Sequence, residues 1–184
     1  MFSLYAVVLF LHSYLRWLVL ALALVLVFRA FSGWRSSRAW SPTDDRVHAA
    51  FVGTLDLQLL LGFLLYLALS PISRAFLASP GASMKVSELR FFGVEHLLLM
   101  LIAIAIVHVG RARSKKRTDA RQRQRGVFVT TLIALLVIFA GIPWPFMHAP
   151  RPLFRASTAA ALMPAHPDLS ARADQLVRCV RSFR

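Results

Sequence analysis

Residues 11–17 read Leu-His-Ser-Tyr-Leu-Arg-Trp, and they lie in the middle of an apolar run from Leu4 to Phe28. This run is long enough to cross a hydrocarbon core about 30 Å thick. His12 and Arg16 are four residues apart, so on a helix they share one face. A charged side chain at such a depth usually faces a bundle interior and has a partner. The stretch therefore predicts a membrane helix with a functional or structural polar face.

The rest of the chain has the same apolar character. Hydrophobic residues make up 58% of its 184 residues, and its mean hydropathy is +0.61. Three further runs can cross a membrane, at 47–69, 91–109 and 126–144. Ser70-Pro71 and Pro143 are expected to stop the helices before them, because proline cannot continue the hydrogen-bond ladder. We therefore predict an all-α integral membrane domain over residues 1–146, in which helices at 4–28, 47–69, 91–109 and 126–144 form an up-down-up-down four-helix bundle.

Residues 147–184 are predicted to form a mostly irregular tail rich in Pro, Ala and Arg. Within it, apolar residues recur at helical spacing between arginines, which predicts an amphipathic helix at 168–183. The only cysteine, Cys179, lies in this segment. A single cysteine excludes an internal disulfide, a Cys-x-x-Cys metal site and a covalent Cys-x-x-Cys-His haem site.

The net charge of +14 is concentrated in loops. The loop between the third and fourth runs has one acid, Asp119, and many bases: Arg111, Arg113, Lys115, Lys116, Arg117, Arg121, Arg123 and Arg125. The first loop adds four arginines: Arg29, Arg35, Arg38 and Arg46. By the positive-inside rule these two loops are cytoplasmic and both termini lie outside. Anionic lipids of a bilayer explain the basic charge, so no nucleic-acid partner is expected.

Two histidines are predicted to lie at the same membrane depth. His12 is four residues to the outer side of the centre of its run, and His96 is four residues to the outer side of the centre of the third run. With a helical rise of about 1.5 Å per residue, both lie roughly 6 Å from the midplane. Two level imidazoles on parallel helices are the axial ligand set of a six-coordinate b-type haem. The sequence therefore predicts bis-histidine haem b binding.

Each polar residue near this pair also has another interpretation. His12 could instead form an interhelical hydrogen bond, and Glu95 could hold His96 in a polar network without metal or act as a proton carrier. Arg16 is expected to form a structural ion pair with Asp56, the carboxylate within the second run. Arg90, at the outer end of the third run, is better placed than Arg16 to bind a haem propionate.

Three segments resemble one family of small membrane proteins. The run from Leu11 to Trp17, the run Leu89-Arg90-Phe91-Phe92-Gly93-Val94-Glu95-His96 and the terminal Ile142-Pro143-Trp144 resemble, in this order, bacterial four-helix membrane proteins labelled cytochrome b. The resemblance covers residues 1–145 and implies a bacterial inner-membrane location. It also implies that His12 and His96 are haem ligands supported by Arg16, Arg90 and Glu95. Some relatives have histidine where this chain has Asp56, which weakens the Arg16–Asp56 pair as a family feature.

Together these features predict an electron carrier rather than a stand-alone enzyme, because bis-histidine ligation leaves no open iron position. Quinol, a redox protein or a larger respiratory complex would be its partner. A second hypothesis is a non-redox structural or assembly subunit, in which the buried polar residues specify helix register. A third is a small proton or solute transporter with Arg16, Asp56 and Glu95 as a relay. This third hypothesis is weakened by the absence of internal repeats and broken helices in the sequence.

Overall fold

The computed structural model of the chain describes residues 4–146, 149, 151, 153 and 154, and all regular structure in this part of the chain is helical. The predicted tail helix at 168–183 and Cys179 lie outside the described residues. The all-α fold class is confirmed for the described part of the chain.

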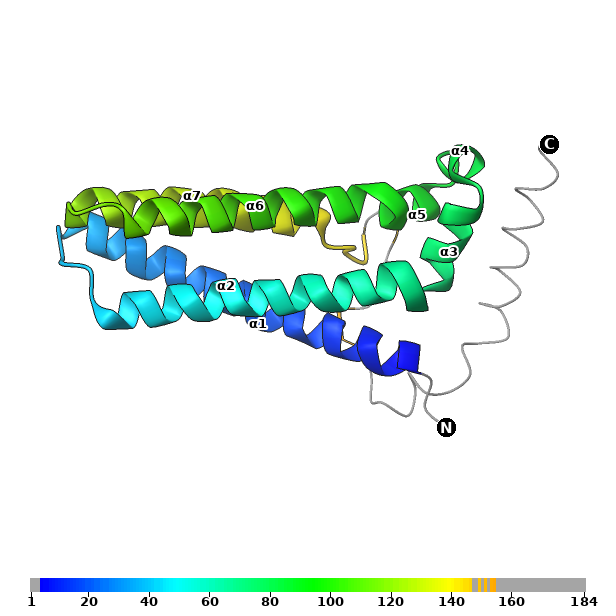
Figure 1. Ribbon diagram of the computed structural model, residues 1–184, viewed down its shortest axis with the longest axis horizontal. Helices are drawn as coiled ribbons and strands as arrows, with labels where there is room; N and C mark the ends of the chain where they lie inside the picture. The colour runs from blue at the N-terminus through cyan, green and yellow to red at the C-terminus, as the bar shows by residue number, and fades with distance from the viewer. Residues whose placement is uncertain (1–3, 147–148, 150, 152, 155–184) are drawn as a thin grey trace. The chain divides into compact units, whose positions relative to one another are not determined.

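Four helical segments are long and apolar enough to cross a membrane (Figure 1). They are α1 (Leu4–Arg35), α2 (Pro42–Leu64) continued by the π-helix η1 (Leu65–Leu69), the series α5 (Ser87–Arg90), π-helix η2 (Phe91–Glu95) and α6 (His96–Lys115), and α7 (Ala120–Gly141). The four apolar helices indicate a multi-pass protein of the lipid bilayer. Each observed helix except α7 at its C-terminal end is as long as predicted or longer, and the added residues include charged ones. Residues 142–144 were predicted to be helical but are not, because Pro143 cannot continue the hydrogen-bond ladder.

Two short helices, α3 (Pro71–Ala78) and α4 (Pro80–Ser83), follow η1, and both contact α5 (Figure 1). Ser70 is extended, with φ −75° and ψ 124°, and its hydroxyl accepts a hydrogen bond from the backbone N–H of Ser73. Pro71 occupies the first turn of α3, where its missing N–H costs nothing. The predicted helix stop at Ser70-Pro71 is therefore confirmed.

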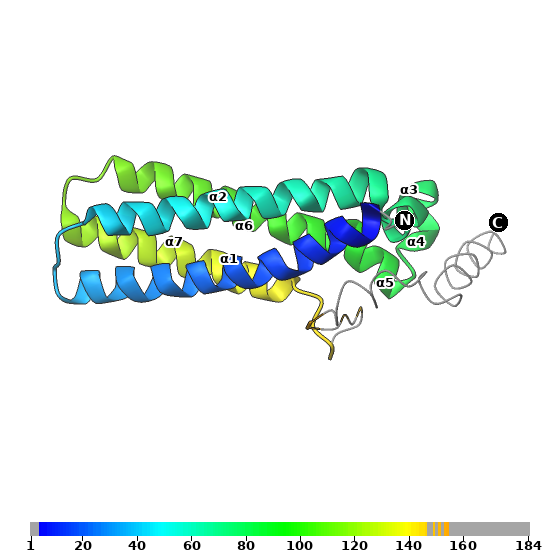
Figure 2. The same ribbon diagram turned by 90° about the horizontal axis from the view of Figure 1, so that it is seen from below.

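The described residues form two compact units. The first unit lies within Met1–Tyr14, Leu60–Leu97 and Ile142–Arg184, and the second consists of Leu15–Leu59 and Leu98–Gly141. In the second unit, parts of α1, α2, α6 and α7 lie side by side (Figure 1, Figure 2). Its core includes the fully buried side chains of Ala23, Phe51, Ala103, Val127 and Ala134.

Glycine at position 93 is required by close packing in the first unit. A Cβ atom at Gly93 would lie 2.3 Å from the Phe76 ring, and both residues are buried. Replacing Gly93 with Ala is therefore expected to destabilise the protein by about 1–3 kcal/mol through overpacking. The matched control is Gly53→Ala on α2, where nothing lies within 4 Å of the added Cβ. Melting temperatures in detergent check this prediction, and equal melting temperatures for the two variants would contradict it.

Candidate functional site

The two histidines predicted to be level lie next to each other in the first unit. His12 is on α1 and His96 is the first residue of α6. Their ring centroids are 6.3 Å apart, and the ring planes cross at 72°. Both side chains are half-buried. The structure thus brings two imidazoles from distant parts of the sequence into one small region.

Aromatic rings and a glycine surround this pair. The rings of Phe91 and Phe92 lie 6.0 Å and 6.2 Å from the His96 ring. On the other side, a Cβ atom at Gly62 would lie 3.3 Å from Cε1 of His12, so the backbone of α2 approaches the imidazole closely. A larger residue at position 62 would contact the His12 ring too closely, so glycine is needed there for the ring to keep its position. Two aromatic rings thus lie beside His96, and the backbone of α2 lies beside His12.

Two π-helical turns lie beside the pair and were not predicted. Tyr66 in η1 donates a 2.9 Å hydrogen bond from its hydroxyl to the backbone carbonyl of Gly93 in η2. The second π-turn ends at Glu95, directly before His96. π-turns are rare and occur frequently at functional sites, because the added residue changes which side chains face a neighbouring helix. The sequence offered only Gly93 as a signal of irregular backbone here.

The two predicted supporting residues of the third helix bind each other. Arg90 Nε lies 2.7 Å from Oε1 of Glu95, and Arg90 Nη1 also donates to the Met84 carbonyl at 3.3 Å. Both side chains of the ion pair are about two-fifths exposed. This ion pair gives Glu95 an acceptor role next to His96. Propionate binding by Arg90 stays a prediction, and in that role its guanidinium would be shared with Glu95.

Arg151 lies at this cluster although the sequence did not single it out. Its guanidinium forms an ion pair with Glu88, and its Cζ lies 4.7 Å from the centre of the Phe92 ring. Phe92 in turn contacts His96, so Arg151 brings positive charge to the outer edge of the same cluster. The residue follows the fourth apolar run, where no motif separated it from the other arginines of the tail.

The other predicted site residues lie in the second unit. The Arg16 guanidinium is 5.2 Å from the centre of the Trp17 ring. Asp56 Oδ1 lies 2.7 Å from Nε2 of His108, a contact that the sequence did not suggest. The Arg16–Asp56 ion pair stays a prediction. The Asp56 and His108 side chains are 46% and 49% exposed, although both residues lie on apolar helices.

The spacing of the two imidazoles can be compared with the spacing that a shared metal requires. Metal–imidazole bonds are about 2 Å long, so two imidazoles on opposite sides of one metal have ring centroids roughly 6 Å apart. The His12–His96 spacing of 6.3 Å agrees with this value. Among the residues that the structure describes, no three His, Cys, Asp or Glu side chains form a metal-binding group. A bis-histidine haem needs only two protein ligands.

No family model, curated protein or solved structure matches this chain. In the part of the chain that the structure describes, the regular structure is helical, four helices are apolar enough to cross a lipid bilayer, and two imidazoles lie next to each other.

Proposed function

We propose that the chain is a b-type haem-binding membrane protein that passes single electrons. The observation that carries this proposal is the spacing of the His12 and His96 rings, at 6.3 Å, with two phenylalanine rings beside His96. Phenylalanine rings at this place suit haem, because the macrocycle is itself apolar. The resemblance to proteins labelled cytochrome b supports the same function.

In this proposal the chain's own residues have distinct roles. His12 and His96 would hold the group from its two sides, and the carboxylate of Glu95 and the guanidinium of Arg90 would supply compensating charges beside His96. Gly62 keeps α2 from pressing on His12. When bound, haem b would supply one-electron redox chemistry. The donor or acceptor would be a quinol, a redox protein or another subunit of a respiratory complex.

The arrangement in the membrane is part of the same proposal. We infer an up-down-up-down bundle with both termini outside, in a bacterial inner membrane, because the basic residues gather in the first and third loops of the sequence. With that topology the histidine pair lies toward the outer side, where an acceptor outside the cytoplasm could be reached.

The absorbance spectrum of the purified, detergent-solubilised protein tests this function. After expression with ample haem, the reduced-minus-oxidised spectrum is expected to contain a sharp α band. Protein that remains colourless under these conditions would refute the proposal. A structural or assembly subunit would be colourless and still folded. A cooperative melting transition in colourless protein would therefore support that hypothesis over misfolding.

The contact between Asp56 and His108 favours a second function, that of a subunit in a membrane complex. A hydrogen-bonded polar pair about half-exposed on two apolar helices is costly in contact with lipid, whereas a neighbouring polypeptide can cover it. The electron-carrier proposal is compatible with this role.

We expect the double change D56A/H108A to reduce the size of the native complex in a mild detergent. The matched control is Leu60→Ala, which truncates a 64% exposed apolar residue of the same helix. Size-exclusion chromatography with light scattering measures the effect. A wild-type protein that is already monomeric would contradict the assembly role. Proton flux in liposomes that is lost in Asp56→Asn would favour the transporter hypothesis instead.

A further inference from the structure

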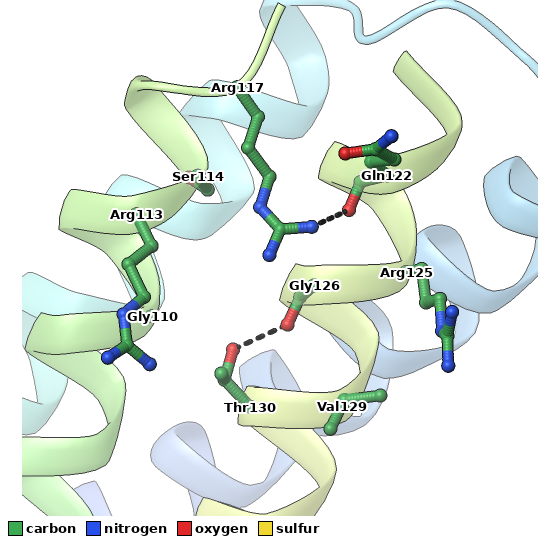
Figure 3. A pocket seen from close by; sticks show the side chains of 9 residues that line it. All are labelled: Gly110, Arg113, Ser114, Arg117, Gln122, Arg125, Gly126, Val129 and Thr130. Carbon is green, nitrogen blue, oxygen red and sulfur yellow. Dashed lines mark hydrogen bonds between the residues drawn. The ribbon is translucent and has the colours of Figure 1, made fainter. Parts of the chain in front are cut away.

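A basic cavity of about 430 Å³ lies in the second unit, between the end of α6 and the start of α7 (Figure 3). Its size falls within the range of about 300–1,000 Å³ that is usual for ligand pockets. The lining residues are Gly110, Arg113, Ser114, Arg117, Gln122, Arg125, Gly126, Val129 and Thr130. Nothing in the proposed electron-transfer function uses this cavity.

The cavity has a strongly positive lining. Arg113, Arg117 and Arg125 all line it, and none of the described lining residues is acidic. The acid of this loop, Asp119, accepts a 2.7 Å hydrogen bond from the backbone N–H of Gln122 and so serves the first turn of α7. The Arg117 guanidinium lies between the two helices and Arg113 adds a second positive charge to the lining, whereas the Arg125 guanidinium lies 5.7 Å from the centre of the Trp34 ring. Guanidinium groups favour an anion, and their planar forks match phosphate oxygens in particular.

Arg117 is the central residue of this cavity. Its side chain reaches between the two helices, and Nη1 donates a 2.7 Å hydrogen bond to the Gln122 carbonyl (Figure 3). This bond fixes the position of the guanidinium and uses one of its five N–H donors. A fixed guanidinium loses less side-chain entropy when it binds a ligand than an unrestrained one.

Two glycines shape the space. A Cβ atom at Gly126 would lie 3.3 Å from the guanidinium carbon of Arg117, and one at Gly110 would lie 2.6 Å from Oγ1 of Thr130. Thr130 itself donates a 2.9 Å hydrogen bond to the Gly126 carbonyl (Figure 3). The absence of side chains at positions 110 and 126 thus lets α6 and α7 approach while Arg117 keeps its place in the cavity.

We propose that this cavity binds the phosphate-bearing headgroup of an anionic lipid. Both helices that form it are apolar enough to cross the membrane, and its arginines flank their apolar stretches. Such arginines lie at the level of the headgroups, and basic pockets between membrane helices bind anionic lipid headgroups. Val129 is 40% exposed and lines the cavity, so its apolar side chain can contact the acyl chains of the lipid.

Native mass spectrometry of the full-length protein, with phosphatidylglycerol titrated into a neutral detergent, tests this proposal. We expect Arg117→Gln to weaken lipid binding about tenfold, because a fixed charge-assisted donor is lost. The neighbouring control Lys116→Gln removes an equal charge from an exposed residue outside the cavity and should change binding by less than about threefold. Phosphatidylcholine should bind weakly to all variants.

A second pair of variants tests the cavity in case Arg117→Gln disturbs the fold. Arg113→Gln leaves the Arg117 bond to Gln122 intact and should also weaken phosphatidylglycerol binding, whereas Lys115→Gln removes an exposed charge outside the cavity and should have little effect. Equal losses in cavity and control variants would overturn the proposal in favour of diffuse attraction. Displacement of the lipid by inorganic phosphate at equal concentration would overturn the lipid as ligand and assign the cavity to a soluble phosphate compound.

Discussion

His12→Ala and His96→Ala are each expected to abolish the α band of the purified protein. The two imidazoles, 6.3 Å apart between ring centroids, act as one ligand set in our proposal, so losing either leaves the iron with one protein ligand. The expected result is therefore a complete loss in each variant rather than half of the signal. The measurement is the reduced-minus-oxidised spectrum, normalised to protein concentration.

The matched control is His108→Ala, which removes a histidine from the same helix, α6, as His96. His108 contacts Asp56 in the second unit, so its loss is expected to leave the α band unchanged. A rescue experiment separates ligation from folding. In His12→Gly, free imidazole in the buffer should restore the α band, since a small ligand can occupy the space of the missing ring.

Two outcomes would contradict the ligand assignment. The first is an α band that persists in His12→Ala or His96→Ala. The second is a colourless wild-type protein whose His12→Gln and His96→Gln variants lose only thermal stability, which would favour the structural hypothesis. Both histidines would then stabilise the fold through polar contacts between helices.

The four membrane helices could be predicted because long apolar runs have few alternatives in a bilayer. Their ends could not be predicted in the same way. Hydropathy ends a run at the first cluster of charges, but arginine and glutamine are good helix formers, so α1 continues to Arg35 and α7 begins at Ala120. Proline gave the more accurate stops, at Ser70-Pro71 and before Pro143.

The neighbouring positions of His12 and His96 agree with the argument from depth, while their role as ligands stays a prediction. The contact between Asp56 and His108 was not predicted. When depth is counted from the centre of each apolar run, Asp56 is central while His108 is near an end. Helices that extend beyond their runs by different lengths need not be aligned at those centres. The π-turns at η1 and η2 change the register further, and no local propensity predicts them.

A buried carboxylate at the junction of α1 and α2 has the largest expected effect on stability. Asp44 is 1% exposed, and its two oxygens accept hydrogen bonds from Arg29, Arg38 and Ser41 at 2.8–3.0 Å. The bond to Asp44 also raises the pKa of the Arg38 guanidinium above its ordinary value, so the cation is retained. This network connects the end of α1, the first loop and the start of α2 within the second unit.

R29Q/R38Q is expected to lower the free energy of unfolding by about 3–5 kcal/mol, because it leaves a buried carboxylate without its cations. Asp44→Asn should cost less, about 1–3 kcal/mol, since Arg29 and Arg38 are about one-third exposed and can be hydrated when the carboxylate is gone. The control R35Q/R46Q removes two exposed arginines near the same junction. Denaturant unfolding in detergent measures all three. If R29Q/R38Q were no less stable than R35Q/R46Q, the cations would be unnecessary to Asp44, and Ser41 alone would have to satisfy its charge.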